Sequence, residues 1–215
     1  FCVNHDKHLV VAGAATALNT IFYSSTSDIE SFTGGGSGSI VLDDQVVGLK
    51  SFRDELFIFC KNSIYKLQNI NNSSTIAIVP VTKNVGCVDG KTIQEFAGDL
   101  IFLAPDGFRT IAGTARIGDV ELGTISKAIQ PIVNKILNSA FTFEFSSVVL
   151  RDKSQYRMYY SSDTQSTANS KGIIGTLTSR GFEWSETLGI QAPAVASGFN
   201  AAGREKMYHG DRGGY

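Results

Sequence analysis

Residues 55–67 read ELFIFCKNSIYKL and residues 99–111 read DLIFLAPDGFRTI, so one pattern occurs twice at an offset of 44 residues. Each copy has an acidic residue, an apolar run, a short turn and a second apolar run. Two apolar runs joined by a turn are typical of a β-hairpin. A repeat of about 40–50 residues is the period of a β-propeller blade. The pattern therefore predicts a propeller built from similar hairpins.

The hairpin recurs more loosely along the rest of the chain. Five equivalent positions can be aligned, with offsets of 47, 44, 57 and 50 residues between successive copies: Leu9, Leu56, Leu100, Arg157 and Met207. These offsets lie within or close to the blade period. We therefore expect an all-β fold, a partial β-propeller with about four blades of a larger propeller, in which the last copy is truncated.

One segment, residues 126–138, departs from the strand pattern. Its apolar positions follow the spacing i, i+3, i+4, i+7 and i+8, which puts five residues on one face of a helix: Ile129, Ile132, Val133, Ile136 and Leu137. Ser126 or Gln130 would cap this short amphipathic helix, and Pro131 would then lie in its first turn, where proline is tolerated. We expect the helix to pack outside the propeller or between two blades.

The composition fits one large all-β domain. The chain has 215 residues with a net charge of −1, and 18% of the residues are charged, so nothing indicates a strongly basic nucleic-acid surface. No apolar run reaches the roughly 18 residues of a membrane-spanning helix, so we expect no membrane span. The sequence begins at Phe1 without a methionine and ends inside a hairpin pattern. We interpret residues 1–215 as the propeller portion of a longer chain.

The sequence predicts no catalytic, cofactor-binding or metal site. His5 and His8 flank Asp6 closely, but no cysteine or further acidic cluster completes a metal-binding set. Asp43 and Asp44 are adjacent, and we interpret them first as a turn and only second as a cation ligand. Neither a Ser-His-Asp order nor a nucleophile-elbow motif is present. We expect a protein that is not an enzyme and holds no cofactor.

The three cysteines, Cys2, Cys60 and Cys87, lack the spacing of a metal or redox motif. Cys60 lies in an apolar run, and we interpret it as a small core residue. A disulfide between two of the three remains open.

The order of several short motifs resembles that of β-propeller proteins in the tails of short-tailed bacteriophages, namely the nozzle, hub and packaged-DNA stabilization proteins. The N-terminal motifs are HLVVAG at 8–13, IFYS at 21–24 and DIESF at 28–32, followed by VGLKSF at 47–52. Further motifs that carry the resemblance lie at residues 56–59, 63–65, 86–87, 99–103, 106–109, 125–126 and 210–215.

This resemblance implies a structural component of the phage virion. Such a protein forms a ring, here expected to be sixfold, below the portal and adaptor. It lines or closes the DNA exit channel and serves as an assembly platform. The implied partners are copies of the same chain, the tail adaptor, and tail fibre or spike proteins. Genomic DNA would pass through the lumen without sequence-specific contact, and the expected location is the virion tail.

An alternative is a carbohydrate-binding or glycan-cleaving propeller. Residues 178–184 (TSRGFEW) resemble the Asp-box hairpin of sialidase propellers only in their Gly-x-x-Trp spacing, because Ser179 stands at the aspartate position. A central cluster of acidic, aromatic and arginine side chains would support this function. Four arginines are candidates for such a cluster: Arg53, Arg109, Arg151 and Arg157.

Overall fold

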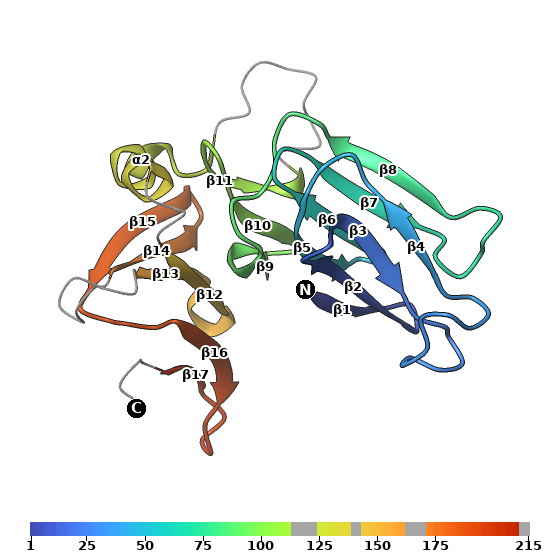
Figure 1. The fold of residues 1–215 in the computed structure, drawn as a ribbon. Coiled ribbons are helices and arrows are strands. Elements are labelled where there is room, and N and C mark those ends of the chain that lie inside the picture. The colour runs from blue at the N-terminus through green and yellow to red at the C-terminus, as the bar shows by residue number, and fades with distance from the viewer. Residues whose placement is uncertain (113–123, 139–142, 162–170, 211–215) are drawn as a thin grey trace. The chain divides into compact units, whose positions relative to one another are not determined.

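The computed structural model describes residues 1–112, 124–138, 143–161 and 171–210. The chain forms two compact units, residues 1–90 and the described residues from 91 onward (Figure 1). Antiparallel sheets dominate both units, as the sequence predicts. Within the described ranges, no helix is long and apolar enough to cross a membrane.

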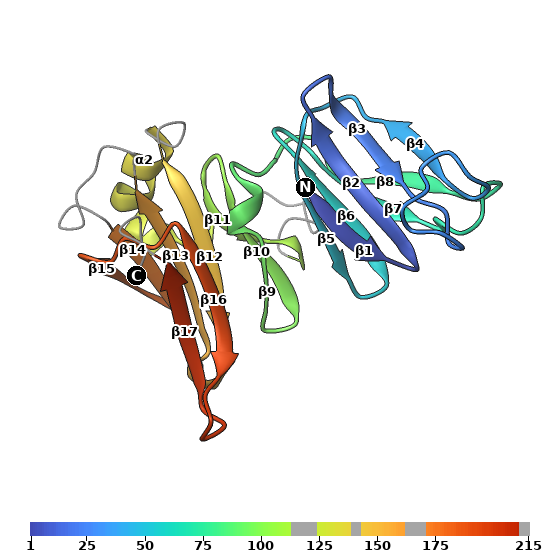
Figure 2. The same cartoon turned by 60° about the horizontal axis from the view of Figure 1, so that its bottom comes forward.

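The first unit consists of two four-stranded antiparallel sheets, in each of which the strands follow one another in sequence order (Figure 2). The first sheet contains β1 (Cys2–His5), β2 (His8–Ala14), β3 (Ala17–Tyr23) and β4 (Gly38–Val41). The second contains β5 (Val46–Phe52), β6 (Glu55–Cys60), β7 (Ile64–Gln68) and β8 (Ala77–Thr82).

The second unit begins with the short 3₁₀ helix η1 (Gly90–Thr92) and contains three further sheets. The first has β9 (Gln94–Phe96), β10 (Asp99–Ala104) and β11 (Gly107–Thr110). Next come the 3₁₀ helix η2 (Lys127–Ile129) and the α-helix α2 (Gln130–Asn138). The second sheet has β12 (Glu144–Leu150), β13 (Gln155–Ser161), β14 (Lys171–Thr178) and β15 (Gly181–Leu188), with η4 (Arg151–Lys153) after β12. The last has β16 (Ala194–Phe199) and β17 (Glu205–Gly210).

The two hairpins of the sequence repeat are β6–β7 and β10–β11. In the first, Phe59 pairs with Ile64, and in the second, Leu103 pairs with Phe108, at the same offset of 44 residues. The five aligned positions lie on β2, β6, β10, β13 and β17, each the second strand of its sheet. The repeat therefore marks equivalent strands, and the predicted hairpin order is confirmed for the described residues.

A second repeat appears in the turns between the first two strands of three sheets. Both residues of each two-residue turn have positive φ angles, 47° and 70°, 49° and 60°, and 52° and 76°, for Asp6–Lys7, Arg53–Asp54 and Ala97–Gly98. Two successive positive φ values define the type I′ turn, whose twist matches that of paired strands. These turns are again 47 and 44 residues apart. The turn geometry thus repeats with the blade, although the residue types do not.

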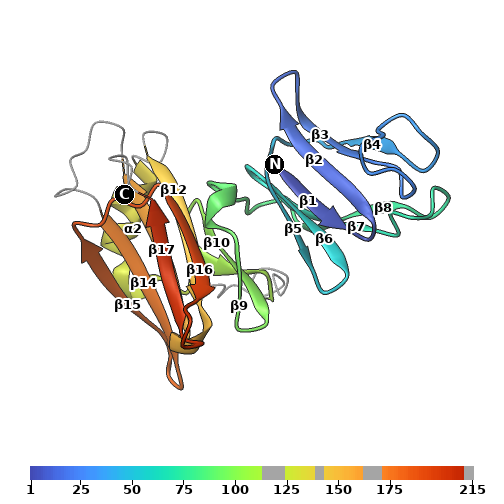
Figure 3. The ribbon, with the colours of Figure 1, turned by 90° about the horizontal axis from the view of Figure 1, so that it is seen from below.

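The first strands of neighbouring sheets lie side by side. In the first unit β1 lies beside β5, and in the second unit β12 lies beside both β9 and β16 (Figure 3). The last two sheets are also joined by two reciprocal hydrogen bonds. The Asp152 backbone N–H donates to the Glu205 carboxylate (2.9 Å), and the Glu205 backbone N–H donates to the Asp152 carboxylate (3.1 Å). Sheets stacked through their first strands are the arrangement expected of propeller blades.

Burial explains why the repeated strands have continuous apolar runs. In both β6 and β10 every residue after the first is buried, so both faces of these strands are covered. A strand covered on both faces has no reason to alternate apolar and polar residues. The core of the first unit is formed by Val10, Ala12, Ile21, Leu42, Val46, Leu56, Ile58, Cys60, Tyr65, Leu67 and Ile70.

The predicted helix is present, but it begins later than expected. The α-helix starts at Gln130, and η2 occupies the three residues before it. Ser126 makes no capping hydrogen bond, because its hydroxyl oxygen instead accepts a bond from the backbone N–H of Phe108. Val133 and Ile136 are the buried residues of α2. The helix lies against β11, so its apolar face packs onto a sheet of its own unit.

Candidate functional site

A polar cluster in the first unit surrounds Asp43 and Asp44, which lie between β4 and β5. An open depression of about 260 Å³ is lined by these two residues and by Asn62, Ser63, Tyr65 and Lys83. Tyr65 donates its hydroxyl hydrogen to Asp43, and the Lys83 ammonium nitrogen lies 3.8 Å from the second Asp43 carboxylate oxygen. The two carboxylates lie in a loop, as their sequence context predicts.

Asp44 holds the β6–β7 turn. Its carboxylate accepts hydrogen bonds from the backbone N–H of Gln45 (2.8 Å), the backbone N–H of Asn62 (2.7 Å) and the hydroxyl of Ser63 (2.8 Å). Burial alone would raise the pKa of Asp44, but these hydrogen bonds together lower it. The ionised Asp44 side chain therefore accepts its hydrogen bonds from donors of its own chain.

The pKa values of Asp43, Asp44 and Tyr65 are all shifted away from neutral pH. The Tyr65 hydrogen bond is the main cause that lowers the pKa of Asp43. Burial, followed by the bond to Asp43, raises the pKa of Tyr65. A general acid or base works best when its pKa is close to the operating pH. The arrangement suits fixed charge and turn stabilisation better than proton transfer.

We expect Asp44→Asn to reduce the acid sensitivity of the first unit. The folded-state pKa of Asp44 lies below its unfolded value of 3.8. The ionised group therefore stabilises the fold above that pH, and this contribution is lost as the pH falls through the folded-state pKa. After discounting for solvent exposure, the variant should lose about 1 kcal/mol at neutral pH. Urea unfolding over a pH series measures this difference, which should vanish in acid.

Asp28→Asn, in the exposed loop before β4, is the matched control and should unfold like the wild type. A wild-type-to-variant difference that stays constant from neutral to acid pH would contradict the assigned role of Asp44.

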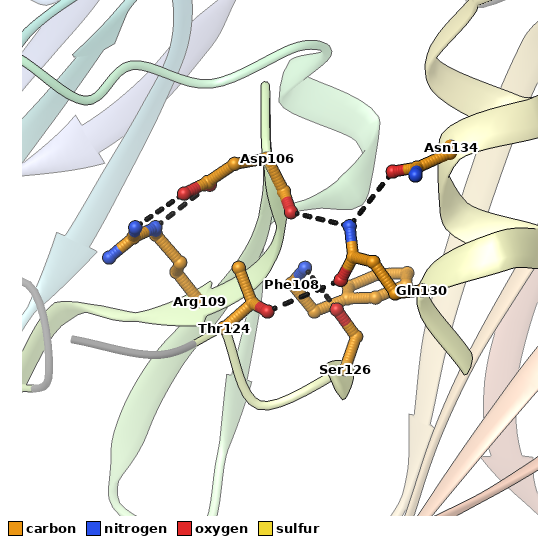
Figure 4. A network of polar contacts seen from close by, with 7 residues as sticks. All are labelled: Asp106, Phe108, Arg109, Thr124, Ser126, Gln130 and Asn134. Carbon is orange, nitrogen blue, oxygen red and sulfur yellow. Dashed lines mark hydrogen bonds and ion pairs between the residues drawn. The ribbon is translucent and has the colours of Figure 1, made fainter. Parts of the chain in front are cut away.

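In the second unit, a polar network joins the β10–β11 turn to α2 (Figure 4). Arg109 binds both carboxylate oxygens of Asp106, at 2.9 and 2.5 Å. This bond is the main cause that raises the pKa of Arg109. The Gln130 side-chain amide donates to the backbone carbonyl of Asp106 and to the side-chain oxygen of Asn134, both at 2.9 Å. The network therefore fixes the first turn of α2 to the hairpin turn.

Ser126 secures the same hairpin from the other side (Figure 4). Its hydroxyl oxygen accepts the buried backbone N–H of Phe108 at 3.1 Å, and the Ile125 backbone N–H donates to the Phe108 carbonyl at 2.9 Å. A Cβ atom on Gly107 would lie 2.6 Å from this hydroxyl oxygen, and Gly107 has a φ of +138°. Glycine is needed here both for its backbone conformation and for the close approach of Ser126.

We expect Ser126→Ala to destabilise the second unit by about 1–2 kcal/mol. The change leaves the buried N–H of Phe108 without its acceptor, and an unpaired buried donor costs about this much. Chemical denaturation followed by circular dichroism measures the loss. Ser37→Ala is the control, because the Ser37 hydroxyl bond to Gly34 is exposed. Equal stability of Ser126→Ala and the wild type would show that the bond is not needed.

The two N-terminal histidines are both buried and both engaged in hydrogen bonds. His5 Nδ1 lies 2.8 Å from the Ser51 hydroxyl oxygen, and His8 is bonded through both ring nitrogens. Burial is the largest cause that lowers the pKa of His5, and Asp6 opposes it. Across the part of the chain that the structure describes, no group of three or more metal-ligating side chains is found.

The four arginines considered for glycan binding have separate surroundings. Arg53 lies over the ring of the preceding phenylalanine, 5.0 Å from its centroid. Arg109 binds Asp106, and Arg157 donates to the Gln155 side-chain oxygen at 3.1 and 2.7 Å. Arg151 lines a different depression of about 310 Å³, near the β9–β10 and β12–β13 turns. The contacts of Arg53, Arg109 and Arg157 are thus made with residues close to them in sequence.

None of the three cysteines, which all lie in the described part of the chain, forms a disulfide. Cys60 is buried in the core of the first unit, as predicted, and burial is the main cause that raises its pKa to about 12. The backbone N–H of Cys87 donates to the Cys60 carbonyl at 2.9 Å, so these two residues are joined through the main chain. A thiol with so high a pKa stays protonated and is a poor nucleophile.

The hairpin at residues 178–184 is held by Thr178 rather than by Ser179 at the Asp-box position. The Thr178 hydroxyl accepts the Arg180 backbone N–H (3.2 Å) and donates to the Gly181 carbonyl (3.0 Å). Trp184 donates its indole N–H to the Ile125 carbonyl at 2.9 Å. Sequence reasoning missed the role of Trp184, because its partner is 59 residues away.

The N-terminal domain of Nup159, known from a crystal structure, is similar to this chain in fold, with a TM-score of 0.53 and 11% sequence identity. That domain is a β-propeller. The chain described here has the fold of a partial β-propeller. The match covers 94% of this chain and 53% of the Nup159 chain, so this chain spans about half the length of the structure it matches. No family model and no curated protein matches the sequence.

Proposed function

We propose that this chain is a non-enzymatic structural component of a bacteriophage tail, in which the propeller acts as an assembly platform. The observation that supports the proposal is that the polar side chains of its clusters form hydrogen bonds to the protein's own backbone. Asp44, Ser126 and Gln130 each bond to the backbone of a β-hairpin. Such clusters stabilise the blades themselves. The order and spacing of the N-terminal and central motifs, which resemble those of phage tail propellers, supply the tail assignment.

Exposed apolar side chains support a role in protein assembly. In the first unit, Val41 on β4 is 69% exposed, and in the second unit, Phe199 at the end of β16 is 70% exposed. Leu188 and Tyr208, on β15 and β17, are also more than half exposed. Apolar side chains at a surface favour contact with another protein when they lie within one patch. Strand edges add backbone donors and acceptors that a partner can use.

In the proposed assembly, copies of the chain form a ring by head-to-tail contacts, which we expect to be sixfold, below the portal and adaptor. Tail fibre or spike proteins would bind its outer side. DNA would pass through the lumen without base-specific contact. A net charge of −1 is consistent with weak phosphate contact, because tight binding to DNA relies on clusters of lysine and arginine.

Cryo-electron microscopy of the virion that contains this chain tests the proposal. We expect several copies in a closed ring at the tail, next to the portal or adaptor. Purified chain should also form oligomers in native mass spectrometry, and Phe199→Ser should weaken them while Ser197→Ala on the same strand should not. The chain in a part of the particle other than the tail, or as an isolated monomer in the tail, would refute the proposal.

A further inference from the structure

The first sheet of the first unit has two apolar faces, and the second sheet covers one of them. The covered face carries Val10, Ala12 and Ile21, which belong to the core that the two sheets share. Side chains alternate between the two faces of a strand, and residues paired across strands share a face. The pairings therefore place a second set of residues on the opposite side, here called the outer face: Cys2, Asn4, Leu9, Val11, Thr20, Phe22, Ser39 and Val41.

The outer face has the composition of a buried surface. Its two central strands contribute Leu9, Val11 and Phe22, and none of the residues that form the outer face is charged. Val41, on the edge strand β4, is 69% exposed. A sheet face that meets water normally carries polar and charged side chains. The other strands among residues 1–90 lie in the second sheet, on the covered side, so no strand of this unit covers the outer face.

The repeat indicates what kind of surface fits the outer face. Leu9, Leu56 and Met207 occupy equivalent positions, each on the second strand of its sheet. Leu56 faces the preceding sheet, because it lies in the core shared with the first sheet. Met207 also faces its preceding sheet, because its sulfur accepts a hydrogen bond from the Tyr159 hydroxyl at 3.1 Å. Leu9 lies on the outer face, which therefore corresponds to the side that meets a preceding sheet.

The last sheet, β16–β17, presents the matching side to solvent. Tyr208 is next to Met207 on β17, so it points to the other side of the sheet, as Val10 does in the first sheet. Tyr208 is 52% exposed, and a Cβ atom on Gly198 would lie 3.4 Å from its ring. Ala196, paired with Tyr208, is also exposed. Small residues around one aromatic ring form a surface that a second sheet can approach closely.

We propose that the outer face of one copy of this chain binds the side of β16–β17 that carries Ala196 and Tyr208 in a second copy. This inference rests on the head-to-tail assembly proposed above and names the two surfaces that form it. The last sheet of the second copy then takes the place of a preceding blade and removes the apolar centre of the outer face from water. Lys206, on the same side as Tyr208, meets no cation there, because the outer face is uncharged. Each contact leaves one outer face and one last sheet free, so further copies add until a ring closes.

Thiol cross-linking of the full chain tests which surfaces meet. Cys2 is exposed on the outer face, whereas Cys60 and Cys87 are buried, and Ala196→Cys adds a thiol to the last sheet. With a short bis-maleimide and a mixture of isotope-labelled and unlabelled copies, we expect mixed-isotope links between positions 2 and 196. Adding Cys2→Ser to this variant should abolish them. Mixed links that join two copies of position 2 or two copies of position 196, or no mixed links at all, would overturn the proposal.

Val41→Lys tests whether the contact needs an apolar outer face. Because Val41 is 69% exposed in the single chain, the variant should fold normally, which thermal unfolding of a dilute sample checks. In analytical ultracentrifugation we expect the dissociation constant between copies to rise about tenfold or more, because the contact would bury an unpaired ammonium group. Ile29→Lys, at a position 57% exposed in the loop before β4, is the matched control and should leave this constant unchanged. Equal dissociation constants for Val41→Lys and the wild type would refute the assigned surface.

The assigned surfaces and the tail assignment can fail separately. Oligomers in native mass spectrometry without links between positions 2 and 196 would overturn the assigned surfaces and leave the proposed ring in place. Links between positions 2 and 196 in a chain that lies outside the tail would support the contact and refute the tail assignment.

Discussion

Gly86→Ala should destabilise the first unit by about 3 kcal/mol or more, because the added methyl group has no space. A Cβ atom on Gly86 would lie 2.1 Å from the Lys61 carbonyl oxygen and 2.4 Å from the Asn62 backbone nitrogen. Both atoms belong to the main chain of the β6–β7 turn, so no rotamer change can relieve the clash. The Asp44 carboxylate and the Cys87 N–H bond hold this turn in place.

Thermal unfolding of Gly86→Ala measures the effect, and Gly35→Ala is its control. A Cβ atom on Gly35 would have no neighbour within 4 Å. The free energy of unfolding of Gly35→Ala should therefore stay within about 0.5 kcal/mol of the wild type. If both variants melted together, the chain following β8 would not pass as close to the β6–β7 turn as the structure places it.

Phe108→Ala should destabilise the second unit by about 3–5 kcal/mol. The Phe108 side chain is fully buried. Its ring stacks on Trp184, with 4.9 Å between centroids and an interplanar angle of 24°, and meets the Tyr156 ring edge-on at 5.7 Å. Truncation leaves a cavity between three elements, and stacked aromatic pairs add about 0.5–1.5 kcal/mol to the loss.

Tryptophan fluorescence reports this change without ambiguity, because Trp184 is the single tryptophan of the chain. We expect Phe108→Ala to unfold at a lower denaturant concentration and its folded-state emission to shift to the red. At a concentration where the chain is monomeric, Phe199→Ala removes the same ring from a position that is 70% exposed and should change neither quantity. An unshifted emission together with an unchanged midpoint would show that Phe108 does not pack on Trp184.

Much of the blade order could be predicted because the signal is local. Each of the apolar runs on β6 and β10 is directly followed by its turn in the sequence. Their 44-residue offset can be recognised without knowing which residues they contact in the fold. The first strands of these sheets, β1, β5 and β9, were harder to recognise in the sequence. Their type I′ turns share backbone angles but differ in residue type, since Asp6–Lys7 and Ala97–Gly98 have no side chain in common.

The polar sites were harder to predict for a different reason. Asp106 and Arg109 are close in sequence, so a contact between them is expected within one hairpin, but Gln130 reaches the same turn from 24 residues away. The sequence suggested Ser126 as a helix cap, but the N–H that donates a hydrogen bond to its hydroxyl oxygen belongs to β11. A side-chain oxygen in a sequence has many possible donors, and only the packed chain selects one.

The repeat at residues 55–67 and 99–111 by itself determined that this protein is built from similar hairpins at the spacing of propeller blades. It could do so because strand formation and hairpin turns depend on neighbours a few residues apart. The tertiary structure decided how the turns are held: Asp44 at β6–β7, Ser126 at β10–β11, and His8 with Asn71 between the first two sheets. These contacts join residues 18 to 63 positions apart, and their geometry arises only when the sheets have packed.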